Sequence, residues 1–136
     1  MNKLKWWLRI VGVFYLLLTL LNLYGIFFNP QLFRDTVPYE VTDLVIRAFS
    51  EAWLAFILEL GVLGGMLLYA SFKPAQSGML VWTIVWAEVF RGVVDDLFFI
   101  SRGYSAASYV PFIVIHIIII VTGIVFLRQA QAEGAR

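Results

Sequence analysis

Apolar residues gather in four long runs along the chain, at about 6–28, 44–70, 78–100 and 109–127. An α-helix needs about 20 predominantly apolar residues to cross the hydrocarbon core of a bilayer, and each run has roughly that length. The pattern predicts an all-α protein with four transmembrane helices.

Short polar segments separate the runs. The segment 29–43 carries two prolines and several charges, which predict a loop, and its aromatic side chains suit a position on the membrane surface. Lys73-Pro74 ends the second run, and Arg102-Gly103 makes the next turn. Because such short connections make neighbouring helices antiparallel, we expect an up-down-up-down bundle in one domain, 1–136, with a short polar tail over 128–136.

The first run resembles a signal peptide only superficially. It is too long for the apolar region of a signal peptide, and no small-x-small cleavage site follows it. We therefore expect it to be retained as a transmembrane helix.

The composition agrees with a membrane protein. Of the 136 residues, 62% are hydrophobic and 14% charged, whereas soluble domains are about 45–50% apolar and about 25% charged. The chain has no cysteine and one histidine, which excludes disulfides, thiolate chemistry and bis-histidine haem within one chain. Its net charge of +1, without a basic run, argues against a nucleic-acid partner.

Lysine and arginine predict the orientation of the bundle. Both termini and the 71–77 connection share one side, and the other two connections share the opposite side. The first side holds Lys3, Lys5, Arg9, Lys73, Arg128 and Arg136, and the second holds Arg34 and Arg102, with Arg47 just inside the membrane. Because cytoplasmic loops are enriched in Lys and Arg, both termini are expected in the cytoplasm.

Eight ionisable residues lie within the apolar runs, and they are the most informative feature of the sequence. They are Arg47, Glu51, Glu59, Glu88, Arg91, Asp95, Asp96 and His116. A charged side chain at the bilayer centre costs roughly 2.5–3.5 kcal/mol even on mild insertion scales, so these groups need partners inside the protein. By depth they gather in the outer half of the bundle, while the cytoplasmic half is almost purely apolar.

Helical spacing predicts which of these residues meet. Arg47 and Glu51 are four residues apart and share one face of a helix. Glu88, Arg91 and Asp95 fall within an arc of about 60°, which predicts ion pairs of Arg91 with both carboxylates. The set contains five carboxylates and two arginines, so either some carboxyl groups are protonated or a cation comes from a ligand, a metal or another chain.

Several interpretations of this acidic set stay open. It could be a polar network that fixes the register of the helices. It could line a cavity for a hydrophobic or amphipathic molecule, in which Glu88 and His116 would be the acid–base candidates if a reaction occurs. It could hold a metal through Glu51, Glu88, Asp95 and His116, although the Glu-x-x-His motif of di-iron bundles is absent. An accessory subunit would obtain the missing cation from its partner.

Gly61 and Gly65 have the small-xxx-small spacing that lets membrane helices approach closely. Packing inside the bundle is the favoured interpretation, and a dimer contact is the alternative.

The sequence also resembles the BphX-like family of small bacterial membrane proteins over nearly its whole length. The resemblance rests on Lys3-Leu4-Lys5-Trp6-Trp7-Leu8-Arg9, Phe14-Tyr15, Asn22-Leu23-Tyr24, Arg47-Ala48-Phe49-Ser50-Glu51-Ala52-Trp53, Glu59-Leu60-Gly61, Glu88-Val89-Phe90-Arg91-Gly92, Asp95-Asp96 and Ile113-Val114-Ile115-His116. It implies no assigned activity and no residue roles. The association of the family name with the breakdown of aromatic compounds mildly favours handling of a hydrophobic molecule.

Together these patterns predict a four-helix inner-membrane protein with an acidic cavity in its outer half. We expect the cavity to bind or handle a hydrophobic or amphipathic small molecule or lipid. Its candidate residues are Glu51, Glu88, Arg91, Asp95 and His116, supported by Arg47 and Glu59. No cofactor is expected, and the pattern identifies no reaction. The expected partners are the lipid bilayer, the small molecule, and either a larger membrane complex or further copies of the chain; the main alternative function is a non-catalytic accessory or assembly subunit.

Overall fold

The computed structural model describes residues 1–34 and 37–134, and this part of the chain is helical without strands. Its elements are α1 (Asn2–Phe28), α2 (Gln31–Arg34), α3 (Asp43–Ala70), the 3₁₀ turn η1 (Pro74–Gln76), α4 (Gly78–Ala87), the π-helix η2 (Glu88–Val94), α5 (Asp95–Ser101) and α6 (Ala106–Gly134). Each of the four apolar runs is thus helical, as the sequence predicts. Within the described residues α1, α3 and α6 are long and apolar enough to cross a membrane.

The largest difference from the predicted elements lies at the C-terminus. The expected polar tail over 128–136 is helical in its described part, because α6 continues to Gly134. Its last turns contain Ala, Gln and Arg. These residues have high intrinsic helix propensity, so the helix continues although this segment is polar. The N-terminal ammonium of Met1 forms an ion pair with Glu133 and joins this extension to α1.

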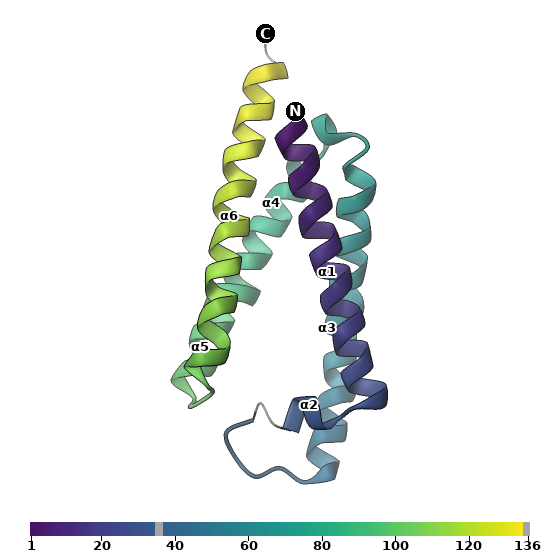
Figure 1. Ribbon diagram of the computed structural model, residues 1–136, viewed down its shortest axis with the longest axis vertical. Helices are drawn as coiled ribbons and strands as arrows, with labels where there is room; N and C mark the ends of the chain where they lie inside the picture. The colour runs from purple at the N-terminus through teal and green to yellow at the C-terminus, as the bar shows by residue number, and fades with distance from the viewer. Residues whose placement is uncertain (35–36, 135–136) are drawn as a thin grey trace.

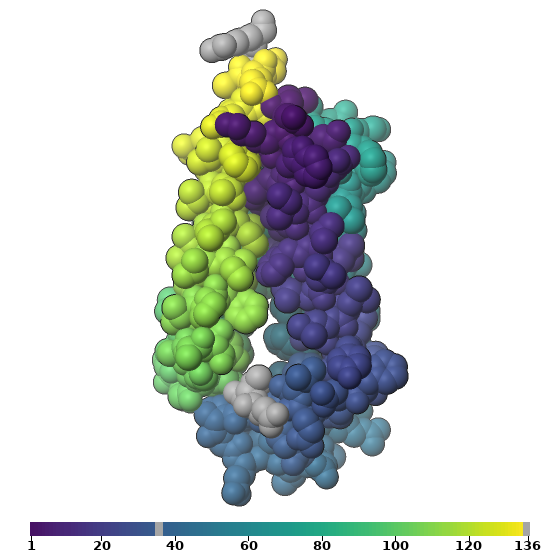
Figure 2. Space-filling model, in the orientation of Figure 1, coloured from purple at the N-terminus to yellow at the C-terminus, as the bar shows by residue number. Residues whose placement is uncertain are grey.

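The helices form two pairs that meet at one end of the molecule. α1 packs along α3, while the consecutive elements α4, η2 and α5 pack along α6. Both termini lie at the end where the pairs meet, and α2 lies at the opposite end, where the pairs diverge (Figure 1). The space-filling view shows an opening between the pairs on the α2 side (Figure 2).

The hydrophobic core fills the end where the termini lie. It joins α1, α3, α4 and α6 through Leu4, Trp7, Leu8, Val11, Tyr15, Leu60, Leu67, Val81, Ile84, Val85, Ile119, Leu127 and Ala130. Among the fully buried members of this cluster, Tyr15 is the last from α1 and Ile119 the first from α6, and beyond them the partly buried Leu18 and Ile115 pack against the core. Tyr15 therefore lies at the boundary between the apolar core and the part of the molecule where the pairs diverge.

Glycines set the close contact between α1 and α3. A Cβ on Gly64 would lie 3.0 Å from the backbone oxygen of Gly12, and a Cβ on Gly61 would lie 3.1 Å from Cγ2 of Thr19. A Cβ on Gly65 would meet nothing within 4 Å. Packing inside the bundle is therefore confirmed for Gly61. The second glycine of α3 that faces α1 is Gly64 and not Gly65, because the surface of α3 that touches α1 follows the i, i+3 direction here.

The diverging ends are connected by two tyrosines. The hydroxyl oxygens of Tyr39, in the loop before α3, and Tyr104, between α5 and α6, lie 3.3 Å apart. Burial, followed by the hydrogen bond with Tyr39, raises the pKa of Tyr104 to about 12. The phenol of Tyr104 therefore keeps its proton near neutral pH, and the contact with Tyr39 connects the two helix pairs at the α2 end.

The glycine contact makes a testable prediction. Gly64→Val should lower the free energy of unfolding by about 1–3 kcal/mol relative to Gly65→Val, because overpacking a helix contact costs that much and the nearest atom is a backbone oxygen of α1, which cannot turn aside as a flexible side chain can. Denaturation of both variants in the same detergent measures the difference. Since the two substitutions are chemically identical, equal stabilities would show that α1 and α3 do not touch at Gly64.

Candidate functional site

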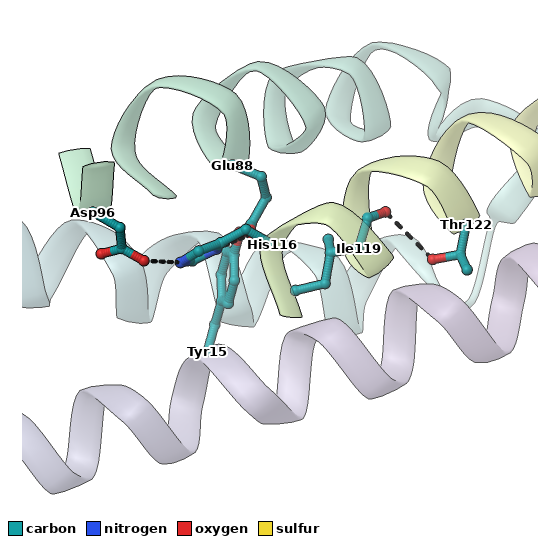
Figure 3. Close-up of polar contacts among 6 residues, drawn as sticks. All are labelled: Tyr15, Glu88, Asp96, His116, Ile119 and Thr122. Atoms are coloured by element: carbon teal, nitrogen blue, oxygen red, sulfur yellow. Dashed lines mark hydrogen bonds and ion pairs between the residues drawn. The ribbon is translucent and has the colours of Figure 1, made fainter. Parts of the chain in front are cut away.

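A buried carboxylate connects three helical elements in the middle of the molecule. Glu88, the first residue of η2, is only 4% exposed. Its Oε1 accepts a hydrogen bond from the hydroxyl of Tyr15 on α1. Its Oε2 lies 2.5 Å from Nδ1 of His116 on α6. The three side chains converge in the close-up view (Figure 3).

A second carboxylate reaches the same imidazole from its other side. Oδ2 of Asp96, on α5, lies 3.6 Å from Nε2 of His116 (Figure 3). Asp96 is 8% exposed, and Oδ2 is buried without a hydrogen-bond partner among the described residues. His116 is thus held between two acids, and one acid oxygen lacks a donor. We call Tyr15, Glu88, Asp96 and His116 the acidic cluster.

The π-helix changes which side chains share a face. A regular α-helix would place Glu88, Arg91 and Asp95 within about 60° of one another. The wider turn of η2 changes this register, so that Glu88 and Asp96 both approach α6 while Arg91 reaches α3. Such π segments occur frequently at functional sites.

Gly92 lets α6 come close to the π-helix. A Cβ at this position would lie 2.5 Å from Cγ and from Nδ1 of His116. Any larger residue would therefore overlap the imidazole ring. The absence of a side chain at Gly92 allows the ring of His116 to reach Glu88.

The expected ion pairs of Arg91 with Glu88 and Asp95 are wrong, because the ion-pair partner of Arg91 is Glu59. Nη1 of Arg91 donates to Oε1 of Glu59 on α3 at 3.0 Å, and its guanidinium lies 4.4 Å from the ring centroid of Phe56. Asp95 is close enough to Arg91 for an electrostatic interaction. Arg91 therefore bridges the two helix pairs instead of neutralising the carboxylate of Glu88.

The expected pair of Arg47 and Glu51 is present, but it lies apart from the acidic cluster. Nε of Arg47 donates to Oε1 of Glu51 at 2.9 Å, and the two side chains are 79% and 66% exposed. Spacing predicts this contact correctly because both residues lie on one regular helix.

The candidate residues thus fall into separate groups. The structure joins Glu88 with His116, Arg91 with Glu59, and Arg47 with Glu51. The sequence pattern did not identify Tyr15 as a polar partner, and it did not assign Asp96 to the candidate site. One feature of the sequence could have indicated a polar contact for Tyr15: its phenol lies inside an apolar run, and a buried hydroxyl usually needs a hydrogen-bond partner.

The separation of these groups bears on the metal hypothesis. Within residues 1–34 and 37–134, no three His, Asp or Glu side chains are arranged to hold a metal ion. Glu51 pairs with Arg47 on α3, away from Glu88 and His116. The four ligands considered from the sequence are therefore not brought together.

The acidic cluster can take part in hydrogen bonding and proton transfer. A carboxylate only accepts hydrogen bonds, so Glu88 is satisfied by a phenol O–H and an imidazole N–H. Asp96 supplies a further acceptor, and the cluster holds two acids against one imidazole. It is chemically suited to a partner that donates hydrogen bonds or carries positive charge.

Two surface grooves lie outside the acidic cluster. One, of about 440 Å³, is almost wholly apolar and runs between α1 and α6 near Trp6 and Phe126. The other, of about 430 Å³, lies where α1, α2 and α3 meet.

The protonation of His116 provides a direct test of the acidic cluster. Because the chain has a single histidine, ¹⁵N-histidine labelling reports one ring. We expect Nδ1 to carry a proton and to show a strong hydrogen bond, since it faces a carboxylate oxygen. Glu88→Gln should weaken that signal, whereas Glu40→Gln in the exposed loop should not change it. An unprotonated Nδ1 in the wild type would contradict the contact.

The close approach at Gly92 makes a second prediction. Gly92→Ala should displace the ring of His116 and remove the Nδ1 signal of the Glu88 contact, because the new Cβ occupies the position of the ring. Gly65→Ala is the matched control, since its Cβ meets nothing within 4 Å. The same NMR spectrum measures both variants, and an unchanged His116 signal in Gly92→Ala would show that α6 is farther from η2.

Comparison with known proteins agrees with the resemblance seen in the sequence. The model of the BphX-like family matches residues 1–132. No curated protein and no solved structure matches the chain. Since the family model covers almost every residue that places the helices and the acidic cluster, the chain belongs to the BphX-like family.

Proposed function

We propose that this member of the BphX-like family is a bacterial inner-membrane protein that binds a hydrophobic or amphipathic small molecule or lipid. The molecule lies between the two helix pairs, and its polar part faces the acidic cluster. The buried Oδ2 of Asp96 carries this proposal: at 3.6 Å its contact with Nε2 of His116 is too long for a hydrogen bond, and a buried acceptor without a hydrogen-bond donor is costly unless a ligand or water supplies one.

The proposed topology has four transmembrane helices with cytoplasmic termini. α1, α3 and α6 meet the length and hydropathy required of membrane-spanning helices. The consecutive elements α4, η2 and α5 form the fourth crossing, since they run antiparallel beside α6 over Gly78–Ser101. The excess of Lys and Arg at the end that carries both termini supports the orientation.

The position of the acidic cluster supports a ligand between the pairs. The main cluster of buried core residues reaches Tyr15 on α1 and Ile119 on α6, with Leu18 and Ile115 partly buried against it, and the pairs diverge farther toward α2. The acidic cluster lies at this boundary, and the opening between the pairs begins on the same side (Figure 2). Small-molecule sites commonly have mostly apolar walls and a few convergent polar groups.

Each polar group has a distinct role in this proposal. Asp96 and His116 contact the polar part of the ligand, and Glu88 with Tyr15 fixes the orientation of the imidazole. The Arg91–Glu59 bridge holds the two pairs at a fixed separation. If the ligand is turned over, His116 and Glu88 are the groups able to transfer a proton.

Native mass spectrometry tests the proposal. The wild-type protein, extracted from its membrane in mild detergent, should carry a discrete small-molecule mass. Asp96→Asn should lower the occupancy about tenfold or more, since one hydrogen bond to a charged group contributes about 1.5–3 kcal/mol. Glu40→Gln, an exposed acid outside the acidic cluster, should retain the wild-type occupancy.

Two results would contradict the proposal. A bare chain in every preparation would leave the acidic cluster as a purely structural network. Co-purification with larger proteins at fixed stoichiometry, without a small-molecule mass, would favour an accessory subunit.

A further inference from the structure

The groove at the α2 end combines apolar walls with four charged side chains. It has a volume of about 430 Å³ and lies between the C-terminal end of α1, α2 and the first turns of α3. Ile26 and Leu54 are among its apolar residues, and its charged residues are Arg34, Asp43, Arg47 and Glu51. None of these residues belongs to the acidic cluster, so the groove is a separate candidate site.

The groove changes from charged to apolar residues along its length, as the headgroup and acyl chains of a lipid do. α3 contributes residues from Asp43, its first residue, to Leu54. At 1.5 Å per residue these span roughly 16 Å along the helix axis. The charged residues occupy the helix end and the next turns, and Leu54 lies deepest in the apolar run. The groove therefore leads from the level of headgroups toward the level of acyl chains.

The charges of the groove form two neutral pairs. Arg34 pairs with Asp43, and Arg47 pairs with Glu51. The bond from Arg47 to Glu51 uses one of the five N–H donors of the guanidinium, so further donors remain for a ligand. A groove that presents two cations and two anions matches a headgroup that itself carries one charge of each sign.

Ser50 supplies independent support for a ligand. It lines the groove and is 7% exposed, and its Oγ is buried without a hydrogen-bond partner among the described residues. It lies between Arg47 and Glu51 in the sequence. A hydroxyl both donates and accepts, so it can bond an ester or phosphate oxygen that enters the groove.

We infer that this groove binds a zwitterionic phospholipid with a primary ammonium headgroup, a phosphatidylethanolamine. The phosphate accepts hydrogen bonds from Arg47 and Arg34, and the ammonium donates to Glu51 and Asp43. Guanidinium and carboxylate groups recognise these two partners through charge-assisted hydrogen bonds. One acyl chain lies along Ile26 and Leu54.

Native mass spectrometry with defined lipids tests this inference. Delipidated protein is mixed with equal amounts of dioleoyl phosphatidylethanolamine, phosphatidylcholine and phosphatidylglycerol. We expect the ethanolamine lipid to bind about tenfold better than the others, the change produced by losing one charge-assisted contact. The choline headgroup lacks ammonium N–H donors, and the glycerol headgroup lacks the cation.

Neutralising the charges should abolish this preference. Arg47→Gln combined with Glu51→Gln should bring the three lipids to equal occupancy. Arg128→Gln combined with Glu133→Gln is the matched control, because it removes one arginine and one glutamate at the opposite end of the molecule, and it should keep the preference. Asp96→Asn should keep it as well, which separates this groove from the ligand proposed for the acidic cluster.

Two tryptophan substitutions distinguish a filled groove from a general effect on folding. Leu54→Trp should fill the groove and reduce binding of every lipid at this site, whereas Leu58→Trp, at an exposed position outside the groove, should not. Equal binding of the three lipids to the wild type would overturn the inference. A preference that survives the double substitution at Arg47 and Glu51 would overturn it too.

Discussion

The arrangement of the helices depends on one buried carboxylate. Glu88 lies inside an apolar bundle, where an uncompensated charge is expensive. Its two oxygens receive hydrogen-bond partners from Tyr15 on α1 and His116 on α6. Because α1 belongs to one helix pair and α6 to the other, satisfying Glu88 fixes the distance and register between the pairs. The apolar residues of the core supply packing, but they carry no comparable requirement for a particular partner.

A local irregularity makes this arrangement available. The π-helix η2 begins at Glu88, and its fifth residue, Gly92, lies against the ring of His116. A regular helix in this stretch would have directed Glu88 and Arg91 to the same neighbour. Here Glu88 approaches α6 while Arg91 crosses to Glu59 on α3. One element thereby provides both an internal polar contact and a bridge between the pairs.

The molecule is divided by depth into an apolar end and a polar end. The core near the termini joins α1, α3, α4 and α6, and the α2 end carries the diverging pairs, the Tyr39–Tyr104 contact and the charged groove. Both proposed binding sites lie toward the end where the core does not fill the space between elements. Their chemistry differs, since the acidic cluster has an excess of carboxylates whereas the groove is neutral overall.

Features that depend on residues close together in the chain follow from the amino-acid sequence alone. Long apolar runs predicted the helices, prolines and polar segments predicted the connections, and the four-residue spacing of Arg47 and Glu51 predicted their ion pair. Contacts between distant segments arise only when the helices pack against one another. Tyr15 with Glu88, Arg91 with Glu59, and Gly64 with Gly12 depend on which helix packs against which and on the register that η2 introduces. Periodicity assumes about 100° per residue throughout a helix, and that assumption fails where the backbone changes from α to π.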